Sequence, residues 1–154
     1  MKPCEIAVIV PVHNAAAFLT ACTDAIAAQK FDGFRCILVE DGSTDDSPAL
    51  CDAIAAGDQR FVALHQTNSG VCAARTAGLR RAQELGARWY AFCDADDLYH
   101  PELLDTLYAA VTSCFVSSRP SVRAMLPSAL YIWSLSYFAG RTHSVLPAVV
   151  QSMS

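Results

Sequence analysis

The stretch W-Y-A-F-C-D-A-D-D (residues 89–97) joins an apolar run to three carboxylates within four positions. The apolar part predicts a buried strand from Trp89 to Cys93. Like charges this close repel one another unless a cation or hydrogen-bond donors offset them, so the cluster indicates a hard metal ion with an anionic ligand. Taken alone, the cluster also fits a solvated turn with helix-capping aspartates.

Short apolar runs alternate with longer amphipathic runs between residues 6 and 93. This pattern is typical of a parallel sheet covered by helices on both faces, and it predicts the α/β class. The predicted strands are 6–12, 35–39, 61–65 and 89–93. The predicted helices are 16–29, a short helix from Pro48 that ends before Gly57, and 71–85.

Each predicted helix has an expected buried face and an expected end. The first helix is expected to bury Phe18, Cys22 and Ile26, and the third to bury Ala74, Gly78, Ala82 and Leu85. Ser47 is the expected N-cap of the second helix. Gly33 and Gly86 are expected to close the first and third helices.

Right-handed crossovers place the loops that follow parallel strands at one edge of the sheet, where ligands of open α/β sheets bind. Four segments are therefore expected to meet there, namely 11–14, 40–43, 68–70 and 94–97. Asp41 could accept a hydrogen bond from a base or ribose, or simply cap a turn. The helix start after Gly70, with Arg75 nearby, suits a diphosphate, although Arg75 also fits an ordinary surface ion pair.

The amino-acid composition, net charge and cysteine content exclude several classes of protein. The chain has 154 residues, 53% hydrophobic and 17% charged, which predicts about one folded domain. A net charge of -4 gives no basic footprint for nucleic acid. Seven cysteines without a C-x-x-C pair argue against a zinc site and a disulfide framework, so a cytoplasmic location is expected. The apolar run 6–12 is too short for a signal peptide or a membrane span.

The sequence changes character after Asp105, beyond which it holds no Asp or Glu and many serines. We therefore expect a first part over 1–110 and an atypical apolar tail over 111–154, either disordered or out of frame. The uncharged run 124–140 is a marginal candidate for a membrane helix. Membrane association thus stays open.

Four motifs occur in one order along the chain: V-I-V-P-V-H-N (8–14), V-E-D-G-S-T-D-D-S (39–47), N-S-G-V-C-A-A-R-T-A-G (68–78) and D-A-D-D (94–97). Together they resemble the nucleotide-diphospho-sugar glycosyltransferases of family 2, over residues 6 to about 110. The resemblance implies the Rossmann-like GT-A fold, here in truncated form.

The resemblance also implies roles for individual residues. The first loop, with Pro11, Val12 and Asn14, would lie beside the base, and Asp41 would hydrogen-bond it. Arg75 would approach the nucleotide, Asp94 the ribose or diphosphate, and Asp96 would coordinate Mg²⁺ or Mn²⁺ as in the family's D-x-D motif. The sequence departs from the family pattern at two positions. Glu40 stands where Asp is commoner, and we still count it among the substrate-binding residues. Thr76 stands where many members have Asn.

The implied activity is transfer of a sugar from a nucleotide-diphosphate sugar, a UDP-sugar above all, to a glycan or lipid-linked acceptor in cell-surface polysaccharide or glycan synthesis. Such enzymes work at the inner face of the cell membrane. An inverting member needs a carboxylate base downstream of D-x-D. Because no carboxylate follows Asp105, the catalytic base is expected outside this chain, and the protein is either a truncated or frame-shifted transferase or an inactive nucleotide-sugar-binding remnant.

Two other enzyme classes fit less well. A phosphohydrolase with an aspartate nucleophile would need a lysine and an acidic pair downstream, and neither follows Asp105. A dinucleotide oxidoreductase would carry G-x-G-x-x-G after its first strand, where this chain has none.

Overall fold

A four-stranded parallel sheet forms the centre of the protein. The computed structural model describes residues 4–117. Its strands are β1 (Ile6–Val12), β2 (Phe34–Asp41), β3 (Phe61–Gln66) and β4 (Trp89–Phe92), in the spatial order β3-β2-β1-β4. β1 and β2 lie inside the sheet and are almost wholly buried, which explains why they read as continuous apolar runs.

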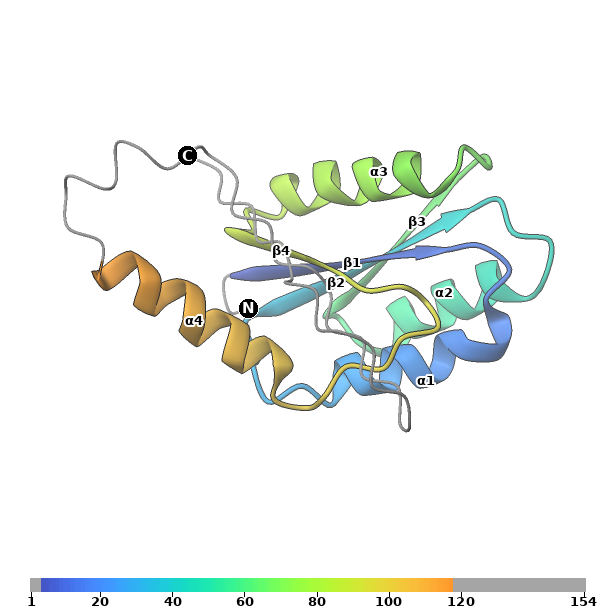
Figure 1. Cartoon of the computed structure of the whole chain (residues 1–154). Coiled ribbons are helices and arrows are strands. Elements are labelled where there is room, and N and C mark those ends of the chain that lie inside the picture. The colour runs from blue at the N-terminus through green and yellow to red at the C-terminus, as the bar shows by residue number, and fades with distance from the viewer. Residues whose placement is uncertain (1–3, 118–154) are drawn as a thin grey trace, which may run out of the picture.

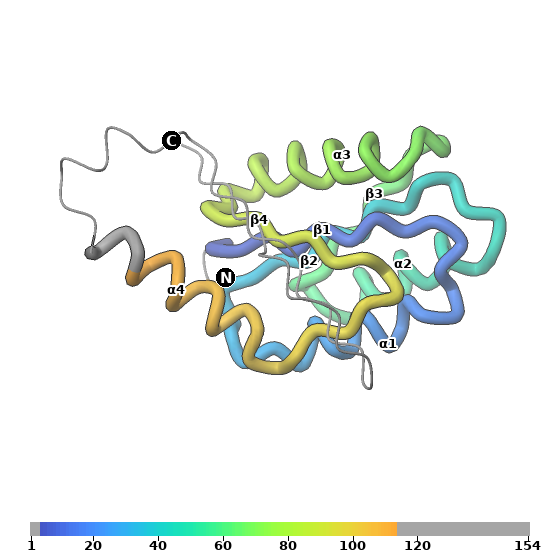
Figure 2. The backbone as a smooth tube through the Cα atoms, in the orientation of Figure 1, coloured from blue at the N-terminus to red at the C-terminus, as the bar shows by residue number. Residues whose placement is uncertain are grey.

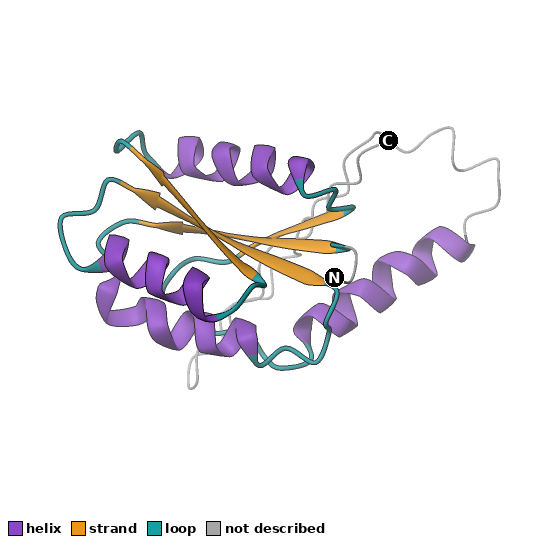
Figure 3. Cartoon of the chain, turned by 180° about the vertical axis from the view of Figure 1, so that it is seen from behind, coloured by secondary structure: helices purple, strands orange, loops and turns teal. Residues whose placement is uncertain are grey.

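Four helices cover the two faces of this sheet. They are α1 (Ala16–Ala27), α2 (Ser47–Gly57), α3 (Val71–Glu84) and α4 (Leu103–Ser117). α3 lies alone on one face, and α1, α2 and α4 lie on the other, as the front and back views show (Figures 1 and 3). The predicted α/β fold with helices on both faces is confirmed.

Alternating side chains of the strands feed two separate cores. Leu38 of β2 points to the larger core, where it packs with α1, α2 and α4. Ile37 and Val39 of the same strand point to the smaller core under α3. The alternation follows from the strand geometry, because successive side chains leave a strand on opposite faces.

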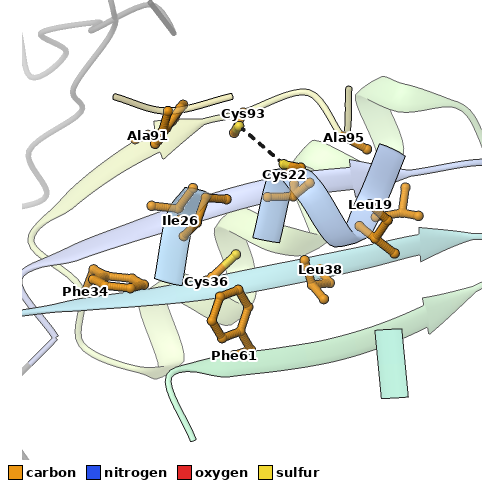
Figure 4. Close-up of a cluster of buried hydrophobic side chains, with 14 of the residues drawn as sticks. Leu19, Cys22, Ile26, Phe34, Cys36, Leu38, Phe61, Ala91, Cys93 and Ala95 are labelled. Carbon is orange, nitrogen blue, oxygen red and sulfur yellow. Dashed lines mark hydrogen bonds between the residues drawn. The ribbon is translucent and has the colours of Figure 1, made fainter. Parts of the chain in front are cut away.

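The larger core contains four free cysteines. Cys22, Cys36, Cys51 and Cys93 are buried, whereas Cys72 is exposed. The sulfurs of Cys22 and Cys93 lie 3.8 Å apart and link α1 to the end of β4 (Figure 4). Burial raises the pKa of the Cys36 thiol well above its ordinary value and that of Cys51 to about 12, so both stay protonated.

Three local predictions need correction. α1 buries Leu19 with Cys22 and Ile26, whereas Phe18 is exposed, because Phe18 lies at the margin of the face that meets the sheet. Gly33 does not close α1, which ends at Ala27. Ser47 is the first residue of α2 rather than its cap. Gly86, with a φ of 72°, does follow the end of α3 as predicted.

Helix α4 was not predicted. It begins eight positions before the predicted boundary at 110/111 and continues past it to Ser117. Its apolar side chains follow a helical spacing and pack on the larger core, and they are Leu103, Leu104, Leu107, Tyr108 and Val111. The rest of the predicted tail, including the run 124–140, lies outside the described residues. Among residues 4–117, no helix is both long and apolar enough to cross a membrane.

Candidate functional site

A cavity of about 430 Å³ opens at the carboxyl edge of the sheet. The loops that follow β1, β2 and β4 and the start of α3 gather at this end of the molecule (Figure 2). Six of the predicted site residues line the cavity, namely Pro11, Val12, Asn14, Asp41, Asp94 and Asp96. Two others, Glu40 and Arg75, are not part of the lining.

Asp41 is the buried carboxylate of the cavity. It ends β2, and only 3% of the residue is exposed. Its Oδ1 accepts hydrogen bonds from Gln66 Nε2 and from the Ser69 amide, both at 2.8 Å. Burial raises the pKa of Asp41, but these hydrogen bonds outweigh it and leave the pKa below its ordinary value. The cavity therefore holds a fixed anion at this end.

The loops after β2 and β3 approach closely beside Asp41. Gly42 has a φ of 64°, and a Cβ built on it would lie 2.6 Å from the amide nitrogen of Asn68. Any larger residue would therefore clash with backbone and be strained as well. This contact holds the turn at Asn68 and Gly70 against the end of β2, where both residues line the cavity.

Glu40 lies on the opposite face of β2 from Asp41 and supports the next loop. Its Oε1 accepts a short hydrogen bond from the Ser43 amide, and its Oε2 lies 3.4 Å from His65 Nδ1. Burial raises the pKa of Glu40, but the hydrogen bonds from Ser43 and His65 bring it below its ordinary value. Glu40 thus shapes the loop behind the cavity instead of lining the cavity.

Asn14 fastens the first loop to the second. Its backbone has a φ of 51°, a conformation that Asn tolerates better than most residues. The Asn14 amide donates to Ser43 Oγ at 3.0 Å, and its side-chain Oδ1 accepts from the Thr44 amide at 2.8 Å. Next to Asn14, His13 Nδ1 donates to the carbonyl oxygen of Asp41 at 2.9 Å. The two loops therefore form one rigid wall.

Asp94 and Asp96 provide exposed carboxylates at the other end of the cavity. Arg75 Nη2, from α3, donates to Asp94 Oδ1 at 2.8 Å, and its guanidinium lies 5.7 Å from the centre of the Phe92 ring. Arg75 and Asp94 are 39% and 56% exposed, so this ion pair is in contact with solvent. One of the three carboxylates is thus offset by a protein cation.

The donor set suits a divalent cation that is only partly held by protein. Asp94 and Asp96 offer carboxylate oxygens, and the described residues contain no group of three or more His, Cys, Asp or Glu that could hold a metal. Mg²⁺ typically binds through one or two carboxylates and takes its other ligands from water and substrate phosphates. The residues present fit that mode of binding.

The other cavity residues fall into two groups. His13, Asn68, Gly70 and Ala95 lie in the segments expected at this edge, although none was given a role, whereas Ala15, Phe18, Val71 and Ala74 lie outside those segments and were missed. Phe18 could have been found from the helical period, since Ala15, Leu19, Cys22 and Ile26 already define a buried face. Nothing in the sequence marks Val71 beyond its place at a helix start. Thr76, the departure noted above, donates its hydroxyl to the Cys72 carbonyl at 2.8 Å, one turn back in α3.

Comparison with known proteins gives one family. The family model for Glycosyl transferase family 2 matches residues 7–126, which is most of the chain. The glycosyltransferase GlyG of Streptococcus pneumoniae serotype 4 is 36% identical over 107 residues, which cover 69% of this chain and 35% of GlyG.

Two solved structures share the fold. TarS 1–349 of S. aureus, in complex with UDP, has a TM-score of 0.71 at 23% sequence identity. The matched region covers 92% of this chain and 38% of the TarS chain. The mannosyltransferase PcManGT of Pyrobaculum calidifontis, in complex with GDP-Man and Mn²⁺, has a TM-score of 0.63 at 25% sequence identity. The matched region covers 86% of this chain and 36% of the PcManGT chain. The chain therefore spans little more than a third of each of these three proteins.

Proposed function

Because the chain belongs to glycosyl transferase family 2, we propose that its cavity binds a nucleotide-diphosphate sugar, with a UDP-sugar as the first candidate. The protein would transfer that sugar to a glycan or lipid-linked acceptor in cell-surface polysaccharide or glycan synthesis. The binding of UDP by TarS and of GDP-Man by PcManGT supports a nucleotide sugar as the donor.

The observation that carries this proposal is the spacing of carboxylates along the cavity. Asp41 follows β2 and the Asp94–Asp96 pair follows β4, with β1 between them. Neighbouring strands lie about 4.8 Å apart, so the two anionic ends are separated by roughly 10 Å. A nucleoside diphosphate fits this length, with its base at Asp41 and its diphosphate at Asp96.

Each end then has its own task. The Asp41 carboxylate, ionised and held by Gln66 and the Ser69 amide, would accept a hydrogen bond from an N–H of the base. Pro11, Val12 and Asn14 would form the wall beside the base, and Glu40 would support that wall from behind. Arg75 is placed to swing from Asp94 to a phosphate oxygen, because its ion pair with Asp94 is in contact with solvent.

Asp96 is the residue we propose as the metal ligand, with Asp94 beside it. When bound, Mg²⁺ or Mn²⁺ would neutralise the charge that grows on the leaving diphosphate. The Mn²⁺ bound with GDP-Man in PcManGT supports a divalent ion in this fold. The buried free thiols support the cytoplasm as the place of action. The inner face of the cell membrane is proposed by analogy with family members that build cell-surface polysaccharides.

The alternative is a remnant that binds the nucleotide sugar without turning it over. The described sequence holds no carboxylate after Asp105 that could deprotonate an acceptor, so these residues do not themselves supply the downstream base of an inverting transferase, and the remnant is kept as the alternative. A turnover assay with a panel of UDP- and GDP-sugars separates the two. Transfer would identify an enzyme, and binding without transfer would identify the remnant.

The proposed donor site is tested by calorimetric titration with UDP in the presence and absence of Mn²⁺. Asp96→Asn should weaken the Mn²⁺-dependent binding of UDP by at least about tenfold, because the substitution removes a ligand charge from the metal. Asp97→Asn is the matched control, since it makes the same charge change in the same loop outside the cavity lining. An equal loss in both variants would contradict the role of Asp96, and no binding of UDP or GDP to the unmodified protein would contradict the donor site itself.

A further inference from the structure

Large exposed apolar side chains are concentrated at the cavity. Within residues 4–117, three large hydrophobic residues are prominently exposed, Phe18 at 56%, Val71 at 49% and Leu98 at 47%. Phe18 and Val71 line the cavity, and Leu98 does not. Ligand pockets are commonly lined by apolar and aromatic groups around a few polar ones, so these two side chains are candidates for ligand contact.

Phe18 lies at the end of the cavity that holds Asp94 and Asp96. It is one helical turn before Cys22, and residues four apart share a helix face. The Cys22 sulfur lies 3.7 Å from the Asp94 carbonyl oxygen and 3.8 Å from the Cys93 sulfur, and Figure 4 shows this side of α1 turned toward Cys93. Phe18 therefore extends from the β4 side of α1, beside the loop that carries the two aspartates.

Val71 approaches the cavity from the other face of the sheet. It is the first residue of α3 and directly follows the turn of Asn68 and Gly70, which is held against Asp41. α1 and α3 lie on opposite faces of the sheet (Figure 1), so the two apolar side chains approach the cavity from different walls.

We propose that Phe18 is a specificity-determining residue whose ring packs against the sugar of the nucleotide-diphosphate sugar. This inference rests on the proposed function, in which the base lies at Asp41 and the diphosphate at Asp96. The sugar is the only part of such a donor that extends beyond the diphosphate, and Phe18 is the aromatic side chain at that end of the lining. The C–H face of a sugar ring and an aromatic face both expose apolar surface to water when they are apart, and contact removes this surface from water, which is favourable.

The test compares two ligands that differ only by the sugar. Dissociation constants of UDP and UDP-GlcNAc, each with Mn²⁺, are measured for the unmodified protein and for Phe18→Ala, with GDP and GDP-mannose as a second pair. Phe18→Ala should raise the ratio of the dissociation constant of the nucleotide sugar to that of its nucleotide by about fivefold to tenfold. Phe18→Tyr keeps the aromatic face and should leave this ratio within about twofold.

Two controls locate the effect. Leu98→Ala removes an equally exposed apolar side chain outside the cavity and should leave both constants unchanged. Val71→Ala should weaken the nucleotide and the nucleotide sugar by the same factor, so that their ratio stays constant. Circular dichroism of each variant confirms that it is folded, which is expected because Phe18 is largely exposed.

Three outcomes overturn the inference while the donor site stands. An equal loss of both ligands in Phe18→Ala would place the ring against the nucleoside, and an unchanged ratio with slower transfer would place it against the acceptor. No change in either ligand or in transfer would leave Phe18 without a role at the site. Failure of the unmodified protein to bind UDP or GDP would instead overturn the proposed function, and this inference with it.

Discussion

His65 occupies a position between two carboxylates behind the cavity wall. Its Nε2 lies 2.9 Å from Asp52 Oδ1 on α2, and its Nδ1 lies 3.4 Å from Glu40 Oε2 on β2. The hydrogen bond with Asp52 raises the pKa of His65, burial opposes this, and Glu40 adds to it. Glu40 also accepts a hydrogen bond from the Ser43 amide, in the loop after β2. The charge on His65 is therefore coupled, through Glu40, to the loop that forms part of the cavity wall.

The stability that His65 contributes should therefore depend on pH. A histidine whose pKa is raised on folding stabilises the folded state fully below its ordinary pKa of about 6.5, and this contribution is lost as the pH rises through the folded pKa. The difference in free energy of unfolding between the unmodified protein and His65→Gln should shrink from about pH 5.5 to about pH 8.5. Urea denaturation across this range measures it.

Asp52→Asn is the companion variant for this prediction. It removes the partner that contributes most to the raised pKa of His65, and it should therefore remove most of the pH dependence. A difference between the unmodified protein and His65→Gln that is constant with pH would contradict the prediction.

The carboxylate cluster shows how one residue can change an electrostatic argument. Three aspartates within four positions suggested that a metal must offset their charge. Arg75 already pairs with Asp94, at a distance of 2.8 Å, and thereby reduces the repulsion without any metal. The argument for a cation now rests on Asp96 and on the ligands that a diphosphate would add.

Among the elements, α3 packs closely on the sheet, and Gly78 makes that approach possible. A Cβ on Gly78 would overlap Ile9 Cγ2 of β1 and lie 3.2 Å from Val39 Cγ2 of β2. Ala74 and Ala82, one turn on either side, are also small and wholly buried. This row of small side chains sets the distance between α3 and the carboxyl edge where Arg75 and Val71 lie.

Gly78→Ala should destabilise the protein by up to about 2 kcal/mol, since overpacking typically costs about 1–3 kcal/mol and the gain in helix propensity returns roughly 1 kcal/mol of it. Gly57→Ala is a control of the same chemistry, because a Cβ there meets nothing within 4 Å. It should be neutral or stabilising by less than about 1 kcal/mol. Urea denaturation of both variants gives the comparison, and equal effects would contradict the packing argument.

The start of α1 is capped from outside its own sequence. The Ala15 amide donates to Oγ of Ser47, the first residue of α2, and the Ala16 amide donates to Oδ2 of Asp45, in the loop before α2, both at 3.0 Å. These side chains satisfy amides that a helix start leaves unpaired. The second loop thus positions α1, and with it Phe18, relative to the cavity.

At the scale of the whole molecule, α4 completes the larger core. Leu104 is fully buried, and its amide donates to Oε1 of the buried Gln29 at 3.0 Å. Gln29 Nε2 donates in turn to the His100 carbonyl at 2.7 Å, which ties the end of α1 to the loop before α4. The unit that carries the cavity therefore includes α4 as well as the residues before it.

We expect a fragment of residues 1–117 to unfold cooperatively, with a midpoint within a few degrees of the full chain, and to keep its affinity for UDP and Mn²⁺. A fragment of residues 1–102 loses Leu103 and Leu104, each of which stabilises by about 2–5 kcal/mol if fully buried, and this approaches the whole stability of a small domain. Thermal melts and calorimetry of both fragments measure this. A folded 1–102 fragment, or an unfolded 1–117 fragment, would contradict the predicted unit.

The sequence alone determined the class of fold, three of the four helices, all four strands and the edge where the cavity lies. Apolar runs and the helical period act locally, and the handedness of crossovers follows from the chirality of the chain, so a single sequence carries them. Helix α4 was not predicted because it spans the change of composition after residue 105, where its leucine spacing runs into a stretch rich in serine and without carboxylates.

Only the tertiary structure decided which side chains face the cavity. Asp41 enters it while Glu40 turns away, and Phe18 is exposed where a buried position was expected. Both depend on how far a strand or helix is rotated against segments that are distant in the sequence. The same holds for the pairing of Arg75 with Asp94 and for the capping of α1 by Asp45, because such contacts exist only after separate loops meet at one edge of the sheet.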